Sequence, residues 1–256
     1  MGLGLLNIVP IFAKKVFCTV DSIVWLTPDV FRIRFVPNKK FEYEAGQFIS
    51  IYSPSRDGTK PVRRAYSLSS SCAEDGYELM ITRVEGGVAS NYMASLKPGD
   101  HFEATAPYGE FRYDSPPDRK ICFIATGTGI APLLSIARSD SFQPEQRPLL
   151  IFGARSENDL LCSDNFESVG FKTKYCLSRQ PGPFDHAFHG RITDFLRSLP
   201  ASWPFHMTDF YLCGNGGMIN EVTDLLLSER GVPRSAVFTE IFFNAHSQVA
   251  PSKNAA

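Results

Sequence analysis

The stretch Arg64-Ala65-Tyr66-Ser67 combines residue types that suit a phosphorylated aromatic ligand. Arginine offers paired donors to a diphosphate, tyrosine offers a flat stacking surface, and serine offers a neutral hydrogen-bonding group. Together they could hold a flavin, with its ring on Tyr66, its N5 atom beside Ser67 and its diphosphate on Arg64. An ordinary barrel strand with solvent-facing Arg and Ser explains the same composition.

A second candidate anion site follows about twenty residues later. Gly86-Gly87-Val88-Ala89-Ser90 precedes a short helical pattern that runs to Leu96. A helix N-terminus presents unpaired N–H groups and a favourable field, and Ser90 adds a hydroxyl. A barrel with two candidate anion sites, joined to a dinucleotide-binding half, suggests two dinucleotides that face each other.

A glycine-rich turn marks a third candidate site. The apolar strand pattern Ile121–Ala125 is followed by Thr126-Gly127-Thr128-Gly129 and then by a helical pattern starting at Ala131. Glycine lets backbone N–H groups approach a phosphate at the start of a helix. The turn lacks both the GxGxxG fingerprint and the P-loop lysine. Tight packing alone is the competing explanation.

Basic residues follow neighbouring strands of the same half. Arg155 comes after the second predicted strand, Ser178 and Arg179 follow the third, and Arg191 begins the next helix. In a parallel sheet these positions converge on one edge, where ligands bind. Guanidinium groups bind phosphomonoesters bidentately, so the cluster favours the 2′-phosphate of NADP over NAD. Each arginine taken singly is more typical of a solvated surface.

These residues belong to two halves with different periodicity. Residues 1–115 contain short strand patterns separated by glycine and proline, which predicts an antiparallel β-barrel. After Ser115-Pro116-Pro117, strands alternate with helices, which predicts a Rossmann-like α/β domain over 116–256 with a parallel sheet and a C-terminal tail. The helices are expected at the following positions: Ala131–Arg138, Glu157–Phe166, Ile192–Leu199 and Met218–Arg230.

Composition narrows the function classes. The 256 residues carry a formal net charge of −1, which argues against a general field for nucleic acid. The six cysteines form no CxxC pair, so no zinc or iron–sulfur site is expected. No signal peptide and no membrane span are predicted. A cytoplasmic monomer is the expectation.

The motifs, in this order, resemble those of the ferredoxin–NADP reductase family, the NAD(P)H:flavin electron-transfer reductases of bacterial type. The resemblance runs from about Val16 to Phe243. Its motifs are Arg64-Ala65-Tyr66-Ser67, Gly87-Val88-Ala89-Ser90, Pro107-Tyr108-Gly109-Glu110-Phe111, Gly127-Thr128-Gly129-Ile130-Ala131-Pro132, and Cys213-Gly214 with Met218.

The resemblance implies roles for individual residues. Tyr66, Ser67, Cys213 and Glu240 would be the catalytic set, with Cys213 beside the nicotinamide and Glu240 handling protons. The FAD would contact Arg64, Ala65, Tyr66, Ser67, Ile81, Thr82, Arg83, Gly87, Val88, Ala89, Ser90, Thr128 and Phe243. The NADP(H) would contact Gly127, Thr128, Gly129, Arg155, Ser178, Arg179, Arg191, Cys213, Gly214 and Met218.

The implied activity is electron transfer between NADPH and a one-electron carrier, with hydride passing to flavin N5. A ferredoxin or flavodoxin would be a separate protein, because the clustered cysteines of a plant-type [2Fe–2S] domain are missing from this chain. Two alternatives stay open within the family: a reductase component of an oxygenase and an NAD(P)H-dependent flavin reductase. A flavin-binding regulatory subunit without turnover is a third, and a phosphate-binding barrel without flavin is a fourth.

Overall fold

The computed structural model describes residues 13–55, 57–142, 148–161, 166, 168, 170–180, 185 and 187–242. They form two compact units. One comprises the chain up to Asp114 together with Ala131–Phe142, and the other comprises Ser115–Ile130 together with the described residues after position 143. The two units are described separately below.

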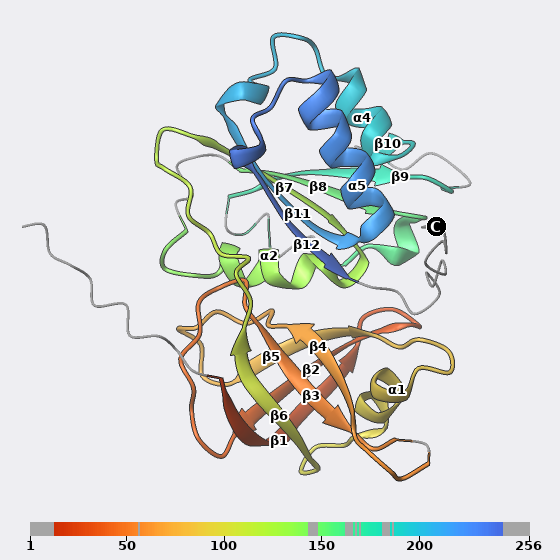
Figure 1. The fold of residues 1–256 in the computed structure, drawn as a ribbon. Coiled ribbons are helices and arrows are strands. Elements are labelled where there is room, and N and C mark those ends of the chain that lie inside the picture. Colours follow the sequence, from red (N-terminus) through yellow and green to blue (C-terminus); the bar gives the residue numbers. More distant parts are fainter. Residues whose placement is uncertain are drawn as a thin grey trace, which may run out of the picture. The chain divides into compact units, whose positions relative to one another are not determined.

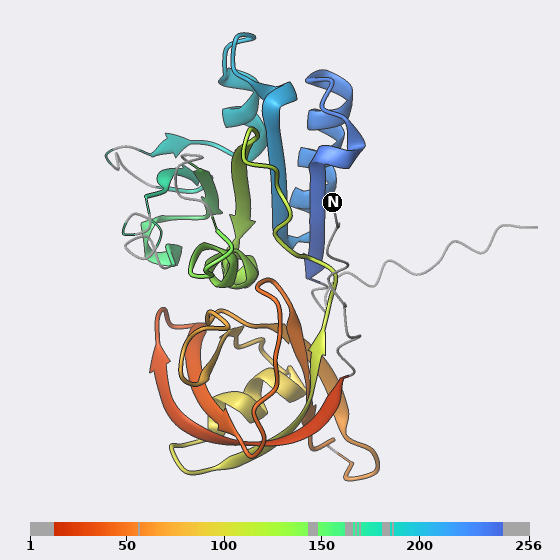
Figure 2. The same ribbon diagram turned by 90° about the vertical axis from the view of Figure 1, so that its left-hand side faces the viewer.

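The first unit is an antiparallel β-barrel, as predicted (Figure 1). Its strands are β1 (Lys14–Trp25), β2 (Val30–Pro37), β3 (Phe48–Ser53), β4 (Val62–Ser67), β5 (Tyr77–Thr82) and β6 (His101–Tyr108). They pair in the order β4-β3-β6-β1-β2-β5, and a bridge between Leu68 and Leu79 joins the two outer strands. Figure 2 shows the strongly curved sheet that results.

Alternating side chains fill the barrel. In β1, Val16, Cys18 and Val20 are buried while their sequence neighbours face outward. This is the period-two pattern of a strand with one apolar face. The short helix α1 (Val88–Ser95) packs Met93 into the same core, where the side chain is fully buried.

The second unit contains a parallel sheet with strand order β10-β9-β8-β7-β11-β12. The strands are β7 (Lys120–Thr126), β8 (Leu149–Ala154), β9 (Lys172–Leu177), β10 (Phe188–His189), β11 (Thr208–Asn215) and β12 (Val237–Phe242). Helices α4 (Ile192–Ser198) and α5 (Gly216–Asp224) cover one face, where Leu196 and Val222 are fully buried (Figure 1). The α/β prediction is confirmed.

Helix α2 (Ile130–Ala137) follows a 3-10 turn, η1 (Gly127–Gly129), at the end of β7. The helix was predicted from its apolar pattern. Its residues from Ala131 onward belong to the same compact unit as the barrel, although the sequence around them belongs to the α/β half.

The helix predicted over Glu157–Phe166 is wrong at its start. The chain forms only a 3-10 turn, η3 (Glu157–Asp159), and then extends at Leu160. The Asp159 carboxylate accepts hydrogen bonds from the backbone N–H and the hydroxyl of Ser156, each at 3.0 Å. This arrangement is a capping box, which stabilises the first helical turn, and the chain leaves the helical conformation directly after that turn.

Candidate functional site

The strand β4 places Tyr66 and Ser67 at its end. Tyr66 is half-buried and packs against the barrel core, and Ser67 is buried. Their backbone partners on β3 are Ile49 and Phe48. Burial raises the pKa of the Tyr66 hydroxyl to about 12, and the Arg64 guanidinium opposes part of that rise. Tyr66 is therefore a neutral aromatic surface at physiological pH.

The preceding residues of β4 are accessible to a ligand. Arg64 and Ala65 are exposed. The Arg64 Nη1 atom donates to the backbone carbonyl of Arg63 at 2.8 Å, which holds the guanidinium close to the strand. The end of β4 therefore presents a charged group close in sequence to an aromatic ring.

The end of β5 lies beside a hollow that the sequence did not reveal. Ile81 is buried, whereas Thr82 and Arg83 are exposed. The Arg83 guanidinium lies 5.2 Å from the centre of the Trp25 ring. An open hollow of about 350 Å³ is lined by Trp25, Leu26, Thr27, Pro28 and Arg83. A guanidinium and an indole ring together suit a planar, electron-rich ring such as a purine.

The N-terminus of α1 has a backbone shape that allows a ligand to approach its N–H groups closely. No side chain caps its first turn. A Cβ atom on Gly87 would lie 2.7 Å from the Ser90 Oγ atom and 3.1 Å from the Val84 carbonyl oxygen, so a glycine is required. The Val84 N–H donates to Ser90 Oγ at 3.1 Å, and Asn91 Nδ2 donates to the carbonyls of Val84 and Gly87. The loop is fixed, and the N–H groups of Val88, Ala89 and Ser90 fit a diphosphate.

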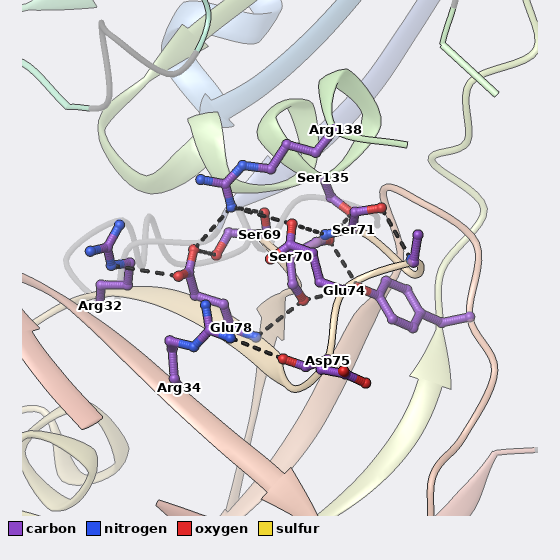
Figure 3. Close-up of polar contacts among 12 residues, drawn as sticks. Arg32, Arg34, Ser69, Ser70, Ser71, Glu74, Asp75, Glu78, Ser135 and Arg138 are labelled. Carbon is purple, nitrogen blue, oxygen red and sulfur yellow. Dashed lines mark hydrogen bonds and ion pairs between the residues drawn. The ribbon is translucent and has the colours of Figure 1, made fainter. Parts of the chain in front are cut away.

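A buried carboxylate in this unit was also missed. Glu78 on β5 is 3% exposed. Its Oε2 atom lies 3.5 Å from Arg32 Nε, and its Oε1 atom lies 3.4 Å from Nη1 of Arg138, the residue that follows α2 (Figure 3). No sequence pattern links positions 78 and 138, because the contact joins segments sixty residues apart.

In the second unit, two glycines bring backbone segments into contact. A Cβ atom on Gly129 would lie 2.4 Å from the Cys213 carbonyl oxygen, and one on Gly214 would lie 2.6 Å from Thr126 Oγ1. The Asn215 N–H donates to Thr126 Oγ1 at 3.1 Å. Gly127 has a φ of +52°, which favours glycine, and no atom lies within 4 Å of a Cβ placed there. The turn Gly127–Gly129 thus packs against the end of β11 at Gly129 and leaves open space at Gly127.

Cys213 lies at the carboxyl end of β11, beside Ala125 of β7 and Glu240 of β12. Burial, with the Glu240 carboxylate adding to it, raises the pKa of the Cys213 thiol well above its usual value. The thiol is therefore neutral. Asn215 caps α5 by accepting from the Met218 N–H at 3.2 Å, which orders the segment after Gly214.

The predicted basic residues follow the carboxyl ends of three neighbouring strands. β8, β9 and β10 are neighbours, and their carboxyl ends carry Arg155, Arg179 and Arg191. The Arg179 N–H donates to the Arg155 carbonyl at 2.7 Å, and the Ser178 N–H donates to the Ala154 carbonyl at 3.1 Å. All three arginines and Ser178 are exposed.

Arg191 is the only one of these arginines with an ion pair recorded in the described parts of the chain. Its Nη1 atom lies 3.6 Å from Glu221 Oε2, and both side chains are largely exposed. Such an exposed pair contributes little to stability, and a more highly charged anion can displace Glu221 from Arg191. The cluster can therefore bind a phosphomonoester.

Phe243, the residue predicted to cover the flavin, lies outside the described residues. Within the described ranges, no group of three or more His, Cys, Asp or Glu side chains could hold a metal ion. Every helix in those ranges is too short or too polar to cross a membrane.

Comparison with known proteins gives two family matches. Residues 18–113 match the oxidoreductase FAD-binding domain, and residues 123–224 match the oxidoreductase NAD-binding domain. The chain is 34% identical to ferredoxin–NADP reductase B of Sorangium cellulosum over 230 residues, 84% of this chain and 92% of that protein.

Two further relatives are components of oxygenase systems or similar reductases. The chain is 30% identical over 241 residues to the ferredoxin reductase component of 3-ketosteroid-9-alpha-monooxygenase from Rhodococcus rhodochrous, which covers 91% of this chain and 67% of that protein. The crystal structure of a cytochrome P450 reductase from Amycolatopsis superposes with a TM-score of 0.77 at 28% identity, covering 90% of this chain and 70% of the other.

Proposed function

Because the chain belongs to the ferredoxin–NADP reductase family of FAD- and NAD(P)-dependent oxidoreductases, we propose that it transfers electrons between NADPH and ferredoxin or flavodoxin. In this proposal residues 1–115 bind FAD and residues 116–256 bind NADP(H). The family matches at 18–113 and 123–224 support that division.

The chain's own residues bind and orient the two cofactors. Tyr66 offers its neutral ring for stacking, Ser67 offers a buried hydroxyl for the N5 position, and Arg64 and the first turn of α1 bind the diphosphate. Held by these residues, FAD would supply a site that accepts a hydride and releases the electrons one at a time. The neutral Cys213 thiol would exclude water beside the nicotinamide without adding a charge. The Glu240 carboxylate, next to Cys213 in the sheet, would accept a proton.

The observation that carries the choice of NADPH is the arginine cluster at the carboxyl ends of β8, β9 and β10. The backbone hydrogen bond between Arg179 and Arg155 keeps both side chains at one edge of the sheet. Three guanidinium groups and the Ser178 hydroxyl match the charge and donor needs of a 2′-phosphate. NADH lacks that phosphate and leaves the cluster unused.

A second candidate function is the reductase component of an oxygenase. Its support is the 30% identity to the Rhodococcus protein, which is the ferredoxin reductase component of a monooxygenase. The two candidates share the flavin chemistry and differ in the acceptor. Ferredoxin or flavodoxin reduction measured beside electron delivery to an oxygenase separates them.

The test is an anaerobic titration of the purified flavoprotein with NADPH and then with NADH, followed by flavin absorbance. We expect NADPH to bleach the flavin at lower concentration than NADH, and Arg179→Ala to abolish that difference. A flavin that neither nucleotide bleaches would mark a binding subunit instead. A colourless protein that does not take up added FAD would remove flavin chemistry altogether.

A further inference from the structure

The segment Ser69–Ser71 directly follows the strand that carries Tyr66 and Ser67, and it is almost entirely buried. Its three serines are 0%, 1% and 2% exposed. Buried backbone and hydroxyl groups require hydrogen-bond partners. For Ser69 and Ser70 the partners come from two directions: the barrel, and the segment formed by α2 and Arg138.

On the barrel side, the segment is held by β5 and by Tyr43. The Ser69 N–H donates to the Glu78 carbonyl at 2.9 Å, and Ser69 Oγ donates to Glu78 Oε1 at 3.0 Å. The Glu78 N–H donates to Ser70 Oγ at 3.1 Å, and the Tyr43 hydroxyl donates to the Ser70 carbonyl at 2.9 Å. These bonds fix the segment in the barrel.

On the other side, two residues of the α2 segment reach the same serines (Figure 3). Ser135 Oγ donates to the Ser70 carbonyl at 2.6 Å. Arg138 Nη1 donates to the Ser69 carbonyl at 3.3 Å and to Glu78 Oε1 at 3.4 Å. Residues three apart share a helix face, so Ser135 and Arg138 act as two adjacent anchors.

The Arg138–Glu78 pair is costly to build. Glu78 is 3% exposed and Arg138 is partly buried, so both charges lose hydration. A buried pair of this kind contributes little net stability compared with apolar residues, and without Arg138 the Glu78 carboxylate would still have Arg32 as an ion-pair partner at 3.5 Å. A role in positioning explains its presence better than stability does.

The helix that these anchors hold starts at the nucleotide turn. Ile130, the first residue of α2, follows Gly127–Gly129 without a break. We propose that Ser135 and Arg138 are positioning residues for hydride transfer. They hold α2, which begins directly after the turn Gly127–Gly129, against the segment Ser69–Ser71, which follows β4. This inference rests on the proposed function. Neither residue touches a cofactor in it; both act through the serine segment and α2.

The test compares Arg138→Met, Arg138→Lys and Ser135→Ala with the wild-type holoenzyme in anaerobic stopped flow. Flavin reduction is measured over a range of NADPH concentrations, which separates the limiting rate from the dissociation constant of NADPH. Displacement of well-positioned reactants by about 1 Å costs on the order of a hundredfold in rate. We expect Arg138→Met to lower the limiting rate at least about tenfold. We also expect a nearly unchanged dissociation constant and retained flavin.

Arg138→Lys should restore part of the rate, because it keeps the charge but loses the fork of donors. Ser135→Ala removes only one hydrogen bond and should lower the same rate by a smaller factor, so the inference stays testable even if Arg138→Met folds poorly. Arg197→Met is the matched control: Arg197 forms a 2.6 Å ion pair with Glu229, remote in sequence from the serine segment. It should leave the limiting rate unchanged.

Wild-type limiting rates in both Arg138→Met and Ser135→Ala would overturn the inference, even if their melting temperatures fell. A wild-type protein whose flavin NADPH does not reduce would instead overturn the proposed function. The two failures are therefore distinguishable in one set of measurements.

Discussion

At the scale of single residues, Ser67 combines burial with a polar group at the end of β4. Its side chain is 4% exposed. The proposed role is a hydrogen bond to the reacting position of the flavin.

We expect Ser67→Ala to slow flavin reduction by NADPH at least about tenfold while the flavin stays bound, because a hydrogen bond aimed at the reacting atoms is lost. Anaerobic stopped flow with flavin absorbance measures it. Ser53→Ala is the control: Ser53 on the neighbouring strand is also fully buried, and its hydroxyl donates to the Val62 carbonyl at 3.1 Å. An unchanged rate in Ser67→Ala would remove this serine from the mechanism.

Tyr66 gives a prediction about pH. Burial raises its pKa from 10.0 to about 12, so the folded protein keeps the proton at pH values where the unfolded chain releases it. The resulting stabilisation is complete below about pH 10 and is lost as the pH rises towards 12. We expect the free energy of unfolding to fall less steeply over this window in Tyr66→Phe than in the wild type. Urea unfolding at about pH 8.5 and pH 11 tests this. Equal slopes would show that Tyr66 ionises normally in the folded state.

At the scale of elements, the contact between the nucleotide turn and the end of β11 depends on glycine at position 129. We expect Gly129→Ala to destabilise the protein by about 3 kcal/mol, because the added methyl group would overlap backbone atoms that side-chain movement cannot relieve. The same change should weaken NADPH binding, since the turn must shift. Urea unfolding and difference spectroscopy measure the two effects.

Gly127→Asn is the matched control for stability. Its φ of +52° is one that asparagine tolerates, and no atom lies within 4 Å of the added Cβ. If both variants unfolded at the same urea concentration as the wild type, the close packing of the turn would be unnecessary.

The element scale also shows what the sequence could predict. Strand and helix patterns were sufficient to predict the barrel, the parallel sheet and α2. The apolar residues that form these patterns are the ones that the fold buries. The order of β8, β9 and β10 then places Arg155, Arg179 and Arg191 at one edge, as parallel topology requires. The helix expected over Glu157–Phe166 is not formed at its start, because the apolar pattern does not reveal that the chain becomes extended at Leu160 after a single capped turn.

The contacts that could not be predicted join distant segments. Arg138 reaches Glu78 across sixty residues, and Arg83 meets Trp25 across a turn of the barrel. Their residue types are common on surfaces, and only the packing of β5 and α2 reveals that Glu78 is buried. Sequence patterns alone contain no information about such pairs.

At the scale of the whole molecule, a net charge of −1 gives no long-range attraction for an acidic electron carrier. Docking of the proposed carrier would therefore depend on local basic groups, of which Arg63 is a candidate. Its guanidinium lies 4.9 Å from the centre of the Tyr52 ring, and its Nε atom donates to Ser50 Oγ at 3.2 Å, so it is ordered although exposed.

We expect carrier reduction to slow as salt is added, whereas flavin reduction by NADPH should change much less. Arg63→Glu should raise the KM for ferredoxin or flavodoxin several-fold, because charge reversal at a docking rim acts mainly on association. The exposed Lys172→Glu in the second unit makes the same charge change and is the control. Steady-state kinetics at two ionic strengths measure the salt dependence and the KM values of the two variants. Identical KM values in the two variants would place the docking surface elsewhere.

The membership of α2 in the barrel unit has a consequence for how such reductases can recombine. A crossover between relatives at residue 116 would combine the barrel of one parent with the α2 of another, and Ser135 and Arg138 would then meet a serine segment from a different lineage. Chimeras that keep Ala131–Phe142 together with the chain up to Asp114 preserve those contacts. The part that a chimera should take from one parent is therefore discontinuous in sequence, because Ala131–Phe142 belongs with the barrel.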